Sequence, residues 1–262
     1  VPKVGGAVET LASDQDSPGA VTVDATSVFW INEAGGKVMR VPKDASEDPK
    51  MLFKADGLRS IALDEHSMYL SRKLKKGEIR KSDKEGGSPL TLAADQPHPT
   101  DIRLLGGLLL WAGLVEPDDD VNGDGIPDGE QGLTGGYVRS MPREGGAVVT
   151  LALGEGEIVA LAVGAGTAVW ADGTNHRIRS QTMVAGEPTT LVEGQDVRGL
   201  AADGSTVLWT TGGGTLKLKS LGDGSVRVLA IDISNAGAVT VDATHAYFLR
   251  TGVGGAVLRV AR

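Results

Sequence analysis

Short apolar segments recur along the chain at a nearly constant interval. Residues 21–30 (VTVDATSVFW) and 239–248 (VTVDATHAYF) are nearly the same string, in which apolar and polar residues alternate before a large aromatic side chain. Related segments occupy 61–70, 102–111, 161–170 and 200–209. Period-two alternation is typical of β-strands, and successive segments lie about 40 residues apart. The pattern therefore predicts six copies of one β-rich repeat.

Two further sets of positions recur with the same interval. One is a basic residue that follows an apolar one, and the other is a leucine that usually follows threonine or valine. The basic residues are Arg40, Arg80, Arg139, Arg179, Lys219 and Arg259. The leucines are Leu11, Leu52, Leu92, Leu151, Leu191 and Leu229. All three sets share one interval that is longer by about 19 residues, so one repeat carries an insertion.

Each repeat is predicted to form four short β-strands. In the first complete repeat they fall near 20–24, 27–32, 37–42 and 49–54, where Val, Leu and Thr are frequent. The Asp-Ala-Thr-Ser string that begins at Asp24 is turn chemistry, because an Asp side chain accepts hydrogen bonds from backbone N–H groups two residues on. No segment has a convincing helical period.

Four strands in each repeat of about 40 residues predict the blades of a β-propeller. We therefore predict an all-β fold, a six-bladed β-propeller that forms a single domain over residues 1–262. The predicted blades are approximately 18–57, 58–99, 100–157 with an insertion at 112–136, 158–196, 197–235, and 236–262 together with 1–17. The last blade lacks a fourth strand, and Ala7 to Ala12 have the pattern of one. We expect this N-terminal strand to pair with the C-terminal blade and close the ring.

Two strings of the first repeat resemble a known group of repeats. Val-Asp-Ala-Thr-Ser-Val-Phe-Trp and Val-Met-Arg-Val-Pro-Lys are similar to the repeats of secreted bacterial six-bladed propellers, distant relatives of the Tyr-Trp-Thr-Asp repeats of the low-density lipoprotein receptor and of TolB-type propellers. The resemblance covers the whole chain, although the aromatic-Trp pair is kept only at Phe29-Trp30. It implies the fold and a secreted, periplasmic or cell-surface location. It implies no single activity, because this fold carries receptors, scaffolds and enzymes.

Charge and composition narrow the class of partner. The chain has 34 acidic and 26 basic residues and a formal net charge of -8, which argues against nucleic-acid binding. It has no cysteine, which excludes disulfides and thiolate zinc sites. No uncharged apolar run reaches the roughly 18–20 residues of a membrane-spanning helix. We expect a monomer with neither a nucleic-acid partner nor a membrane span.

The insertion contains an acidic segment that resembles a calcium loop. Counted from Asp120, oxygen-bearing side chains fall at positions 1, 3, 5 and 9, with Gly125 at position 6, as in an EF-hand loop. The segment also resembles the calcium loops of thrombospondin type 3 repeats and dockerins, but its position 12 is Gln131. With calcium as the cofactor, the predicted ligands are Asp118, Asp120, Asn122, Asp124, the carbonyl of Ile126, Asp128 and Glu130. Asp118 or Asp119 could replace the missing ligand, or the register could slip by one residue. A solvated acidic loop without metal is the alternative.

Other candidates lie in the loops of one propeller face. The connections from strand four to strand one, and from strand two to strand three, surround the mouth of the central channel and hold the least repetitive residues. The ligand-binding candidates there are Arg59, His98, Asp101, Glu157, Asp196 and Arg198. Of these, His98 is best suited to chemistry, and a plain loop residue is the alternative. We interpret the four tryptophans as core residues rather than a stacking set, and the basic set as outer-strand charges rather than an anion funnel.

These observations favour a non-catalytic interaction module that binds a protein, peptide or glycan at the mouth face. No catalytic residue is assigned, because the chain contains no nucleophile elbow, no His-Glu-x-x-His motif and no phosphate loop. The alternative is an extracytoplasmic metal-dependent hydrolase, similar to lactonases, or a lyase with its site in the channel. Glu157, Asp101, Asp196 and Asn235 could then hold the metal.

Overall fold

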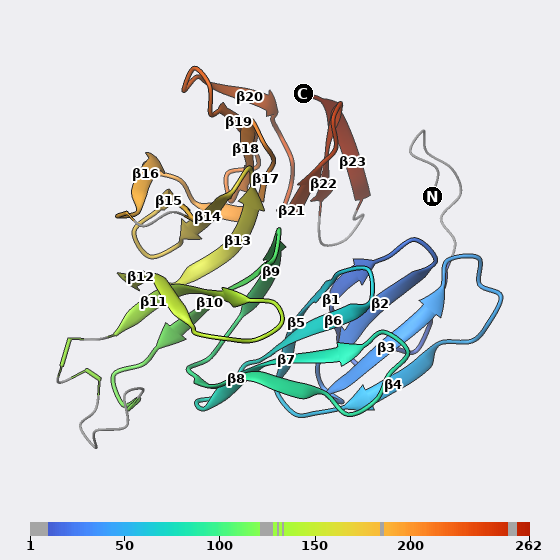
Figure 1. Cartoon of the computed structure of the whole chain (residues 1–262). Helices are drawn as coiled ribbons and strands as arrows, with labels where there is room; N and C mark the ends of the chain where they lie inside the picture. Colours follow the sequence, from blue (N-terminus) through green and yellow to red (C-terminus); the bar gives the residue numbers. More distant parts are fainter. Residues whose placement is uncertain (1–9, 121–127, 130, 133, 184–185, 251–255) are drawn as a thin grey trace. The chain divides into compact units, whose positions relative to one another are not determined.

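The computed structural model describes residues 10–120, 128–129, 131–132, 134–183, 186–250 and 256–262. In this part of the chain every regular element is a β-strand, and each sheet is built from strands that follow one another in the sequence (Figure 1). Neighbouring strands are antiparallel. The chain forms two compact units, residues 1–102 and 103–262.

Two four-stranded sheets make up most of the first unit. The first sheet consists of β1 (Pro18–Val23), β2 (Ser27–Asn32), β3 (Lys37–Pro42) and β4 (Lys50–Lys54). The second consists of β5 (Leu58–Leu63), β6 (Ser67–Arg72), β7 (Gly77–Asp83) and β8 (Leu90–Gln96). In both sheets the chain moves outward strand by strand, so β4 and β8 are edge strands.

The second unit contains the remaining sheets, the first of which begins at the end of the first unit. The third sheet consists of β9 (Asp101–Leu105), β10 (Leu108–Val115), β11 (Gly135–Pro142) and β12 (Val149–Glu155). The fourth consists of β13 (Ile158–Gly164), β14 (Thr167–Asp172), β15 (Arg177–Thr182) and β16 (Thr189–Val192). The fifth consists of β17 (Val197–Ala202), β18 (Thr206–Thr211), β19 (Leu216–Ser220) and β20 (Val226–Ala230). The sixth shows β21 (Ala236–Val241), β22 (His245–Arg250) and β23 (Ala256–Ala261).

Six antiparallel meanders in succession make a six-bladed β-propeller, which confirms the predicted fold class. We number the blades in chain order. The closing strand was expected at Ala7 to Ala12, of which residues 7–9 lie outside the described residues; residues 10–17 contain no strand. Closure by an N-terminal strand therefore stays a prediction, and so do the single-domain interpretation and the blade boundaries.

The four tryptophans are core residues, as predicted. Trp111, Trp170 and Trp209 are fully buried, and Trp30 is 6% exposed. Each lies on the second strand of its blade, and Trp170 and Trp209 pack among aliphatic residues of the neighbouring strands and of the preceding blade. Trp170, for example, packs in one cluster with Ala152 of blade three and Leu161 of blade four. Burial of one such side chain in each repeat joins successive sheets.

The third strand is not in the same register in every blade. Arg179 lies opposite Trp170 in blade four. In blade five Lys217 lies opposite Trp209, while Lys219 pairs two positions away. The constant interval of the basic residues in the sequence therefore hides differences in the length of the connection between the second and third strands. The repeated basic residues do not form one equivalent set.

In two blades a glutamine that precedes the blade satisfies the buried indole. Gln15 Oε1 accepts a hydrogen bond from Trp30 Nε1 at 3.1 Å. Gln195 Oε1 accepts one from Trp209 Nε1 at 3.0 Å and another from Lys217 Nζ at 3.0 Å. A buried N–H without an acceptor is destabilising by about 1–3 kcal/mol, so the glutamine allows a tryptophan to occupy this position.

Blades that lack the tryptophan have an apolar residue instead of the glutamine. Ala55 packs against the cluster that contains Leu70. Ile233, which is 4% exposed, packs in one cluster with Phe248. The two positions therefore vary together: an indole occurs with an amide, and a hydrocarbon side chain with a hydrocarbon side chain.

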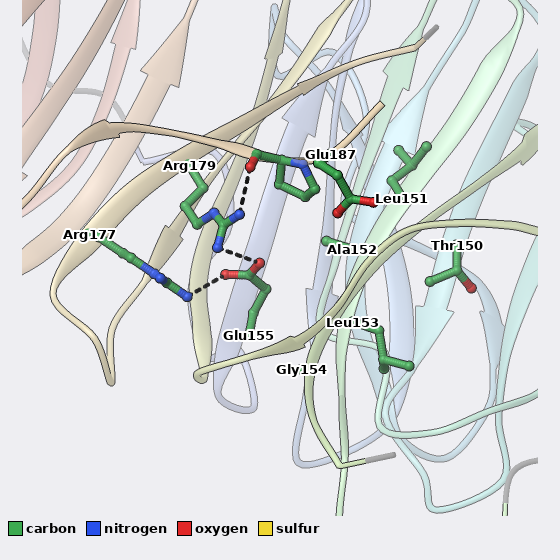
Figure 2. Close-up of a pocket in the computed structure, with 10 residues that line it drawn as sticks. Thr150, Leu151, Ala152, Leu153, Gly154, Glu155, Arg177, Arg179 and Glu187 are labelled. Carbon is green, nitrogen blue, oxygen red and sulfur yellow. Dashed lines mark hydrogen bonds and ion pairs between the residues drawn. The ribbon is translucent and has the colours of Figure 1, made fainter. Parts of the chain in front are cut away.

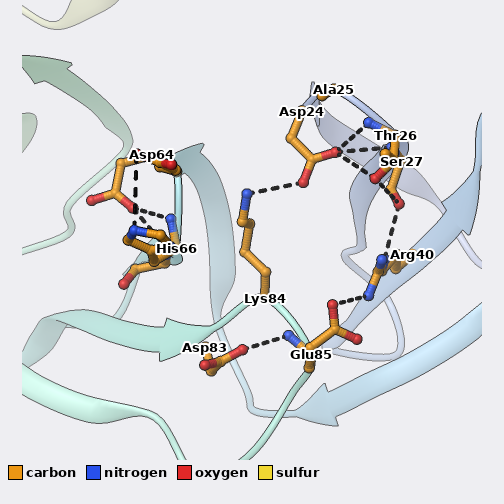
Figure 3. A network of polar contacts seen from close by, with 12 residues as sticks. Asp24, Ala25, Thr26, Ser27, Arg40, Asp64, His66, Asp83, Lys84 and Glu85 are labelled. Atoms are coloured by element: carbon orange, nitrogen blue, oxygen red, sulfur yellow. Dashed lines mark hydrogen bonds and ion pairs between the residues drawn. The ribbon is translucent and has the colours of Figure 1, made fainter.

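Ion pairs connect the first two blades at the turn between the first and second strands (Figure 3). Asp24 accepts hydrogen bonds from the backbone N–H groups of Thr26 and Ser27, both at 2.9 Å. Lys84, from the β7–β8 turn of blade two, lies 3.0 Å from the Asp24 carboxylate. Burial raises the pKa of Asp24, but the bond from Lys84 and the two N–H bonds outweigh it and hold the pKa far below its ordinary value.

The second unit repeats this contact where the turn carries an aspartate. Arg262 of blade six pairs with Asp203 of blade five. Burial raises the pKa of Asp203, but backbone N–H groups and Arg262 outweigh it and lower the pKa to about 2. Blade three has Leu105 in place of the aspartate, and Met183 of blade four, in place of the cation, packs against the same apolar cluster. The partner on the next blade therefore matches the chemistry of the turn residue.

The contact between Lys84 and Asp24 predicts a pH-dependent contribution to stability. Because the pKa of Asp24 is lowered on folding, the contribution is present above the ordinary pKa of about 4 and is lost as the pH falls below it. Lys84→Met should lower the free energy of unfolding by roughly 1 kcal/mol at pH 7 and by less at pH 2.5. Urea unfolding at both pH values, with the exposed Lys76→Met as the control, measures the difference. An equal loss at both pH values would contradict the assignment.

Candidate functional site

The mouth-loop candidates of the first unit have local partners. Arg59 Nη1 lies 2.7 Å from Glu33 Oε1, and the two side chains are 47% and 35% exposed. Asp101 Oδ1 accepts a hydrogen bond from Ser60 Oγ at 3.2 Å. These contacts connect β5 with the β2–β3 turn and with the start of β9, and both residues stay ligand-binding candidates.

His98 occupies a turn that recurs in the repeat. It lies four residues before the recurring apolar position of the first strand, as Ser17, Gly57 and Asn235 do in other blades. All four residues have positive φ, with values of 40°, 53°, 72° and 50° for His98, Ser17, Gly57 and Asn235. The backbone N–H of His98 donates to the carbonyl of Leu74 at 2.9 Å. Its unusual backbone conformation therefore belongs to the repeated turn and is not evidence of a special chemical role.

The candidates of the second unit are exposed. Glu157 makes its described contacts through its backbone, and its N–H donates to Thr174 Oγ1 at 3.0 Å. Arg198 Nη2 lies 3.2 Å from Asp196 Oδ2, with both side chains more than half exposed. Glu157 lies in the connection between β12 and β13, Asp196 lies in the connection between β16 and β17, and Arg198 is on β17.

The base of the insertion is closed by hydrogen bonds. The backbone N–H of Asp128 donates to the carbonyl of Asp119 at 2.6 Å, and that of Gly129 donates to Pro117 at 2.9 Å. Asp119 and Asp128 are buried, with 2% and 0% exposure, whereas Asp118 and Asp120 are exposed. The remaining predicted ligands lie outside the described residues: Asn122, Asp124, Ile126 and Glu130.

The two buried aspartates face charged and aromatic groups of β11. The Arg139 guanidinium lies 4.5 Å from the centre of the Tyr137 ring. Burial lowers the pKa of Arg139, while Tyr137 and the Asp128 carboxylate act in the opposite direction. Burial raises the pKa of Tyr137, and the negative charge of Asp119 raises it further. Arg139 therefore offsets part of the negative charge at the base of the insertion. Among the described residues, no three His, Asp or Glu side chains gather closely enough to hold a metal ion.

A groove of about 360 Å³ lies beside the edge strand β12 (Figure 2). We call it the β12 groove. One wall is Thr150 to Glu155, and the other is formed by Arg177 and Arg179 of β15 together with Glu187 and Pro188. Its volume is within the range of small-molecule and peptide pockets.

Glu155 forms ion pairs with both arginines of the groove (Figure 2). Glu155 Oε2 lies 3.1 Å from Arg177 Nη2, and Oε1 lies 3.2 Å from Arg179 Nη1. Arg179 also donates to the carbonyl of Pro188 at 2.7 Å. The Glu155 side chain is only 5% exposed, whereas those of Arg177 and Arg179 are 24% and 17% exposed. The carboxylate therefore lies behind the guanidinium groups.

A second buried carboxylate supports Arg177 from the same side. Arg177 Nε donates to Asp172 Oδ2 at 2.9 Å, and the Asp172 side chain is fully buried. Asn175 donates to Asp172 through its backbone and side-chain N–H groups, at 3.0 and 2.8 Å. Burial raises the pKa of Asp172, but the bonds from Asn175, Gly156 and Arg177 outweigh it and lower the pKa. The carboxylates of Glu155 and Asp172 balance the charges of Arg177 and Arg179, and the guanidinium donors are on the exposed side of this cluster.

Glu155 occupies a position that holds an amide or an apolar side chain in the other five blades. The residue 14 or 15 positions before the aromatic position is Gln15, Ala55, Gln96, Glu155, Gln195 and Ile233 in blades one to six. Only blade four has a carboxylate there. Trp170 Nε1 is buried and has no hydrogen-bond acceptor in the described part of the chain, because the Glu155 oxygens contact the arginines. Blades one and five make this hydrogen bond, whereas Trp111 of blade three and Trp170 of blade four lack it in the described part of the chain.

The groove itself recurs, but its charged lining does not. In blade one a groove of about 380 Å³ is lined by the equivalent positions: Thr10 to Ser13, Gln15, Met39, Asp48 and Pro49. Met39 stands where Arg179 stands, since each lies opposite the tryptophan of its blade. Sequence analysis did not single out Glu155 or Arg177. The signal that could have identified them is the Gln-to-Trp spacing and its one acidic exception.

No family model and no curated protein matches the chain. Solved structures do match over most of its length. Virginiamycin B lyase from Staphylococcus aureus is 11% identical with a TM-score of 0.69, over 95% of this chain and 86% of that one. Regucalcin from Agrobacterium tumefaciens strain C58, described as a calcium-binding protein, is 13% identical with a TM-score of 0.62, over 90% and 82%.

The structure of a nidogen/laminin complex also contains a similar chain, which is 17% identical with a TM-score of 0.62, over 86% of this chain and 85% of that one. At these identities the likeness shows the fold alone. It agrees with the six-bladed propeller expected from the repeat. Within the described residues, no helix is long and apolar enough to span a membrane.

Proposed function

We propose that the chain is a non-catalytic interaction module that binds a protein, peptide or glycan, and that the β12 groove is its binding surface. The observation that carries the proposal is the acidic exception at Glu155. In blades one and five the glutamine at this position accepts the hydrogen bond of the buried indole, although Trp111 of blade three has no acceptor in the described residues. In blade four Glu155 orients Arg177 and Arg179 in an open groove, at the expense of the Trp170 hydrogen bond. A local loss of stability of this kind is typical of functional sites.

The groove lies beside the mouth-face loops on which the sequence candidates are placed. Glu155 is the last residue of β12, and the connection to β13 contains Glu157. A ligand in the β12 groove would therefore also reach the face on which the interaction was expected. The nidogen/laminin complex supports an interaction role for this fold, and the sequence resemblance supports a secreted or periplasmic location.

Calcium is the second part of the proposal. The EF-hand-like pattern from Asp120 and the calcium-binding regucalcin among similar structures support a bound Ca²⁺ with a structural role. Asp128 is one of the predicted ligands and lies buried at the base of the insertion. A bound cation would therefore lie near the negative charge of Asp128, part of which Arg139 already offsets.

A lyase or hydrolase is the second candidate function. It is favoured by the likeness to virginiamycin B lyase over nearly the whole chain. It is also favoured by the mouth-loop positions. Three of the four residues proposed to hold the metal lie four residues before the first-strand core position of their blade, namely Glu157, Asp196 and Asn235. This reading requires a metal ion in addition to that of the insertion, which elemental analysis of the purified protein would detect.

Substitution on β12 tests the binding surface. Leu153 is exposed on β12 and lines the groove. Leu153→Arg should abolish binding to whichever members of a peptide array and a glycan array the wild-type protein recognises, because the new side chain fills the groove. Val228→Arg, at an equally exposed position on the edge strand β20, is the matched control and should bind as the wild type does. Unchanged binding by Leu153→Arg would place the binding surface elsewhere.

Chelation tests the calcium loop. Removal of Ca²⁺ with EGTA should increase proteolysis between residues 115 and 135 at least severalfold, because repulsion among the carboxylates opens the loop, while the rest of the chain stays resistant. Mass spectrometry of the fragments identifies the cleavage sites. The double variant Asp120→Asn, Asp124→Asn should be cleaved there with or without EGTA. If EGTA does not change the rate of cleavage in wild-type protein, the insertion does not depend on calcium.

A further inference from the structure

The outer edge of β12 lacks the charges that protect the other edge strands. A free strand edge pairs readily with another chain, and proteins usually block it with charged side chains, proline or a very short strand. Exposed charged residues occur on the other long outer strands: Lys50 and Lys54 on β4, Asp95 on β8, and Arg227 on β20. β16 has only four residues. β12 has seven, and its one charged side chain, Glu155, is buried.

The same strand presents its backbone edge to the groove. Successive side chains of a strand point to opposite faces of the sheet, so a pocket on one face is lined by alternate residues. The β12 groove is instead lined by every residue from Thr150 to Glu155. On its other side β12 pairs with β11, and no described strand pairs with its outer edge. The groove therefore gives access to unpaired N–H and C=O groups along β12.

The opposite wall supplies hydrogen-bond donors. Arg177 and Arg179 line the groove, and the carboxylates that balance them are buried behind them. A guanidinium has five N–H donors in a planar arrangement that suits a carboxylate. The wall therefore favours a ligand with an acidic group.

We propose that the β12 groove binds an extended peptide, which adds to the outer edge of β12 as a fifth strand of that sheet and places an acidic side chain against Arg177 and Arg179. This inference rests on the proposed function and names its ligand class. Main-chain hydrogen bonds to β12 supply affinity, and the arginines supply specificity. The exposed Leu153 offers a contact for an apolar side chain of the peptide.

Glu187 provides a variant with the opposite effect. It is exposed and lines the same wall as the arginines. Its negative charge opposes an acidic peptide, and its exposure means that substitution does not disturb the core. Glu187→Gln should therefore strengthen binding, whereas Arg177→Gln should weaken it.

The probe is a peptide selected from a phage library of random 12-residue sequences and then synthesised. We expect an Asp or Glu in the selected sequence, and its replacement by Asn or Gln should weaken binding about tenfold. That tenfold difference should vanish in Arg177→Gln. N-methylation of every second backbone nitrogen should abolish binding for one of the two alternating sets and change it less than about threefold for the other, since only one set faces β12. Fluorescence anisotropy measures each affinity.

Changes to the peptide leave the fold of the protein untouched, so the test does not depend on the stability of a variant. Equal effects of the two N-methylated sets, or indifference to the acidic residue and to Glu187→Gln, would overturn the inference. If Leu153→Arg abolishes binding of glycans and no peptide is selected, strand addition is wrong while the proposed function stands. If Leu153→Arg affects no binding of either kind, both are wrong.

Discussion

The fold depends on the burial of one large side chain in each blade between successive sheets. An aliphatic or phenyl side chain needs only shape and volume there, as Leu70 and Phe248 show with their apolar partners. An indole also needs an acceptor for its N–H group, which Gln195 supplies to Trp209. In blades one, two, five and six the residue before the blade therefore matches the side chain that the blade buries. A blade that breaks this rule must be stabilised by something else.

Blade four breaks the rule and is stabilised by charge. Glu155 replaces the amide, its carboxylate binds two guanidinium groups, and Asp172 supports one of them from behind. Ion pairs of this kind offset the desolvation of their members without adding much stability, and the indole N–H of Trp170 is left without an acceptor in the described residues. What the arrangement adds is a polar groove beside an unprotected strand edge. Binding, rather than stability, accounts for such a substitution.

The sequence predicts the fold because buried positions repeat: the tryptophans and the first-strand aliphatic residues carry the period. It could not show the register of Lys217, because the connection before β19 differs in length from that of blade four. In the insertion the pattern pointed to Asp118, Asp120 and Asp128, whereas the buried residues are Asp119 and Asp128, which lie near Tyr137 and Arg139 only after folding. The role of Glu155 could not be predicted, because it depends on Arg177 and Arg179, which become its neighbours only in the folded sheet.

The most direct test restores the blade-five arrangement in blade four with the double variant Glu155→Gln, Arg179→Lys, which recreates the contacts of Gln195 with Trp209 and Lys217. Urea unfolding and binding of the selected ligand are measured on the same preparation. We predict a free energy of unfolding equal to that of the wild type or higher by up to about 1 kcal/mol, with binding weakened at least about tenfold. Unchanged binding, or a large loss of stability, would contradict the view that Glu155 serves recognition.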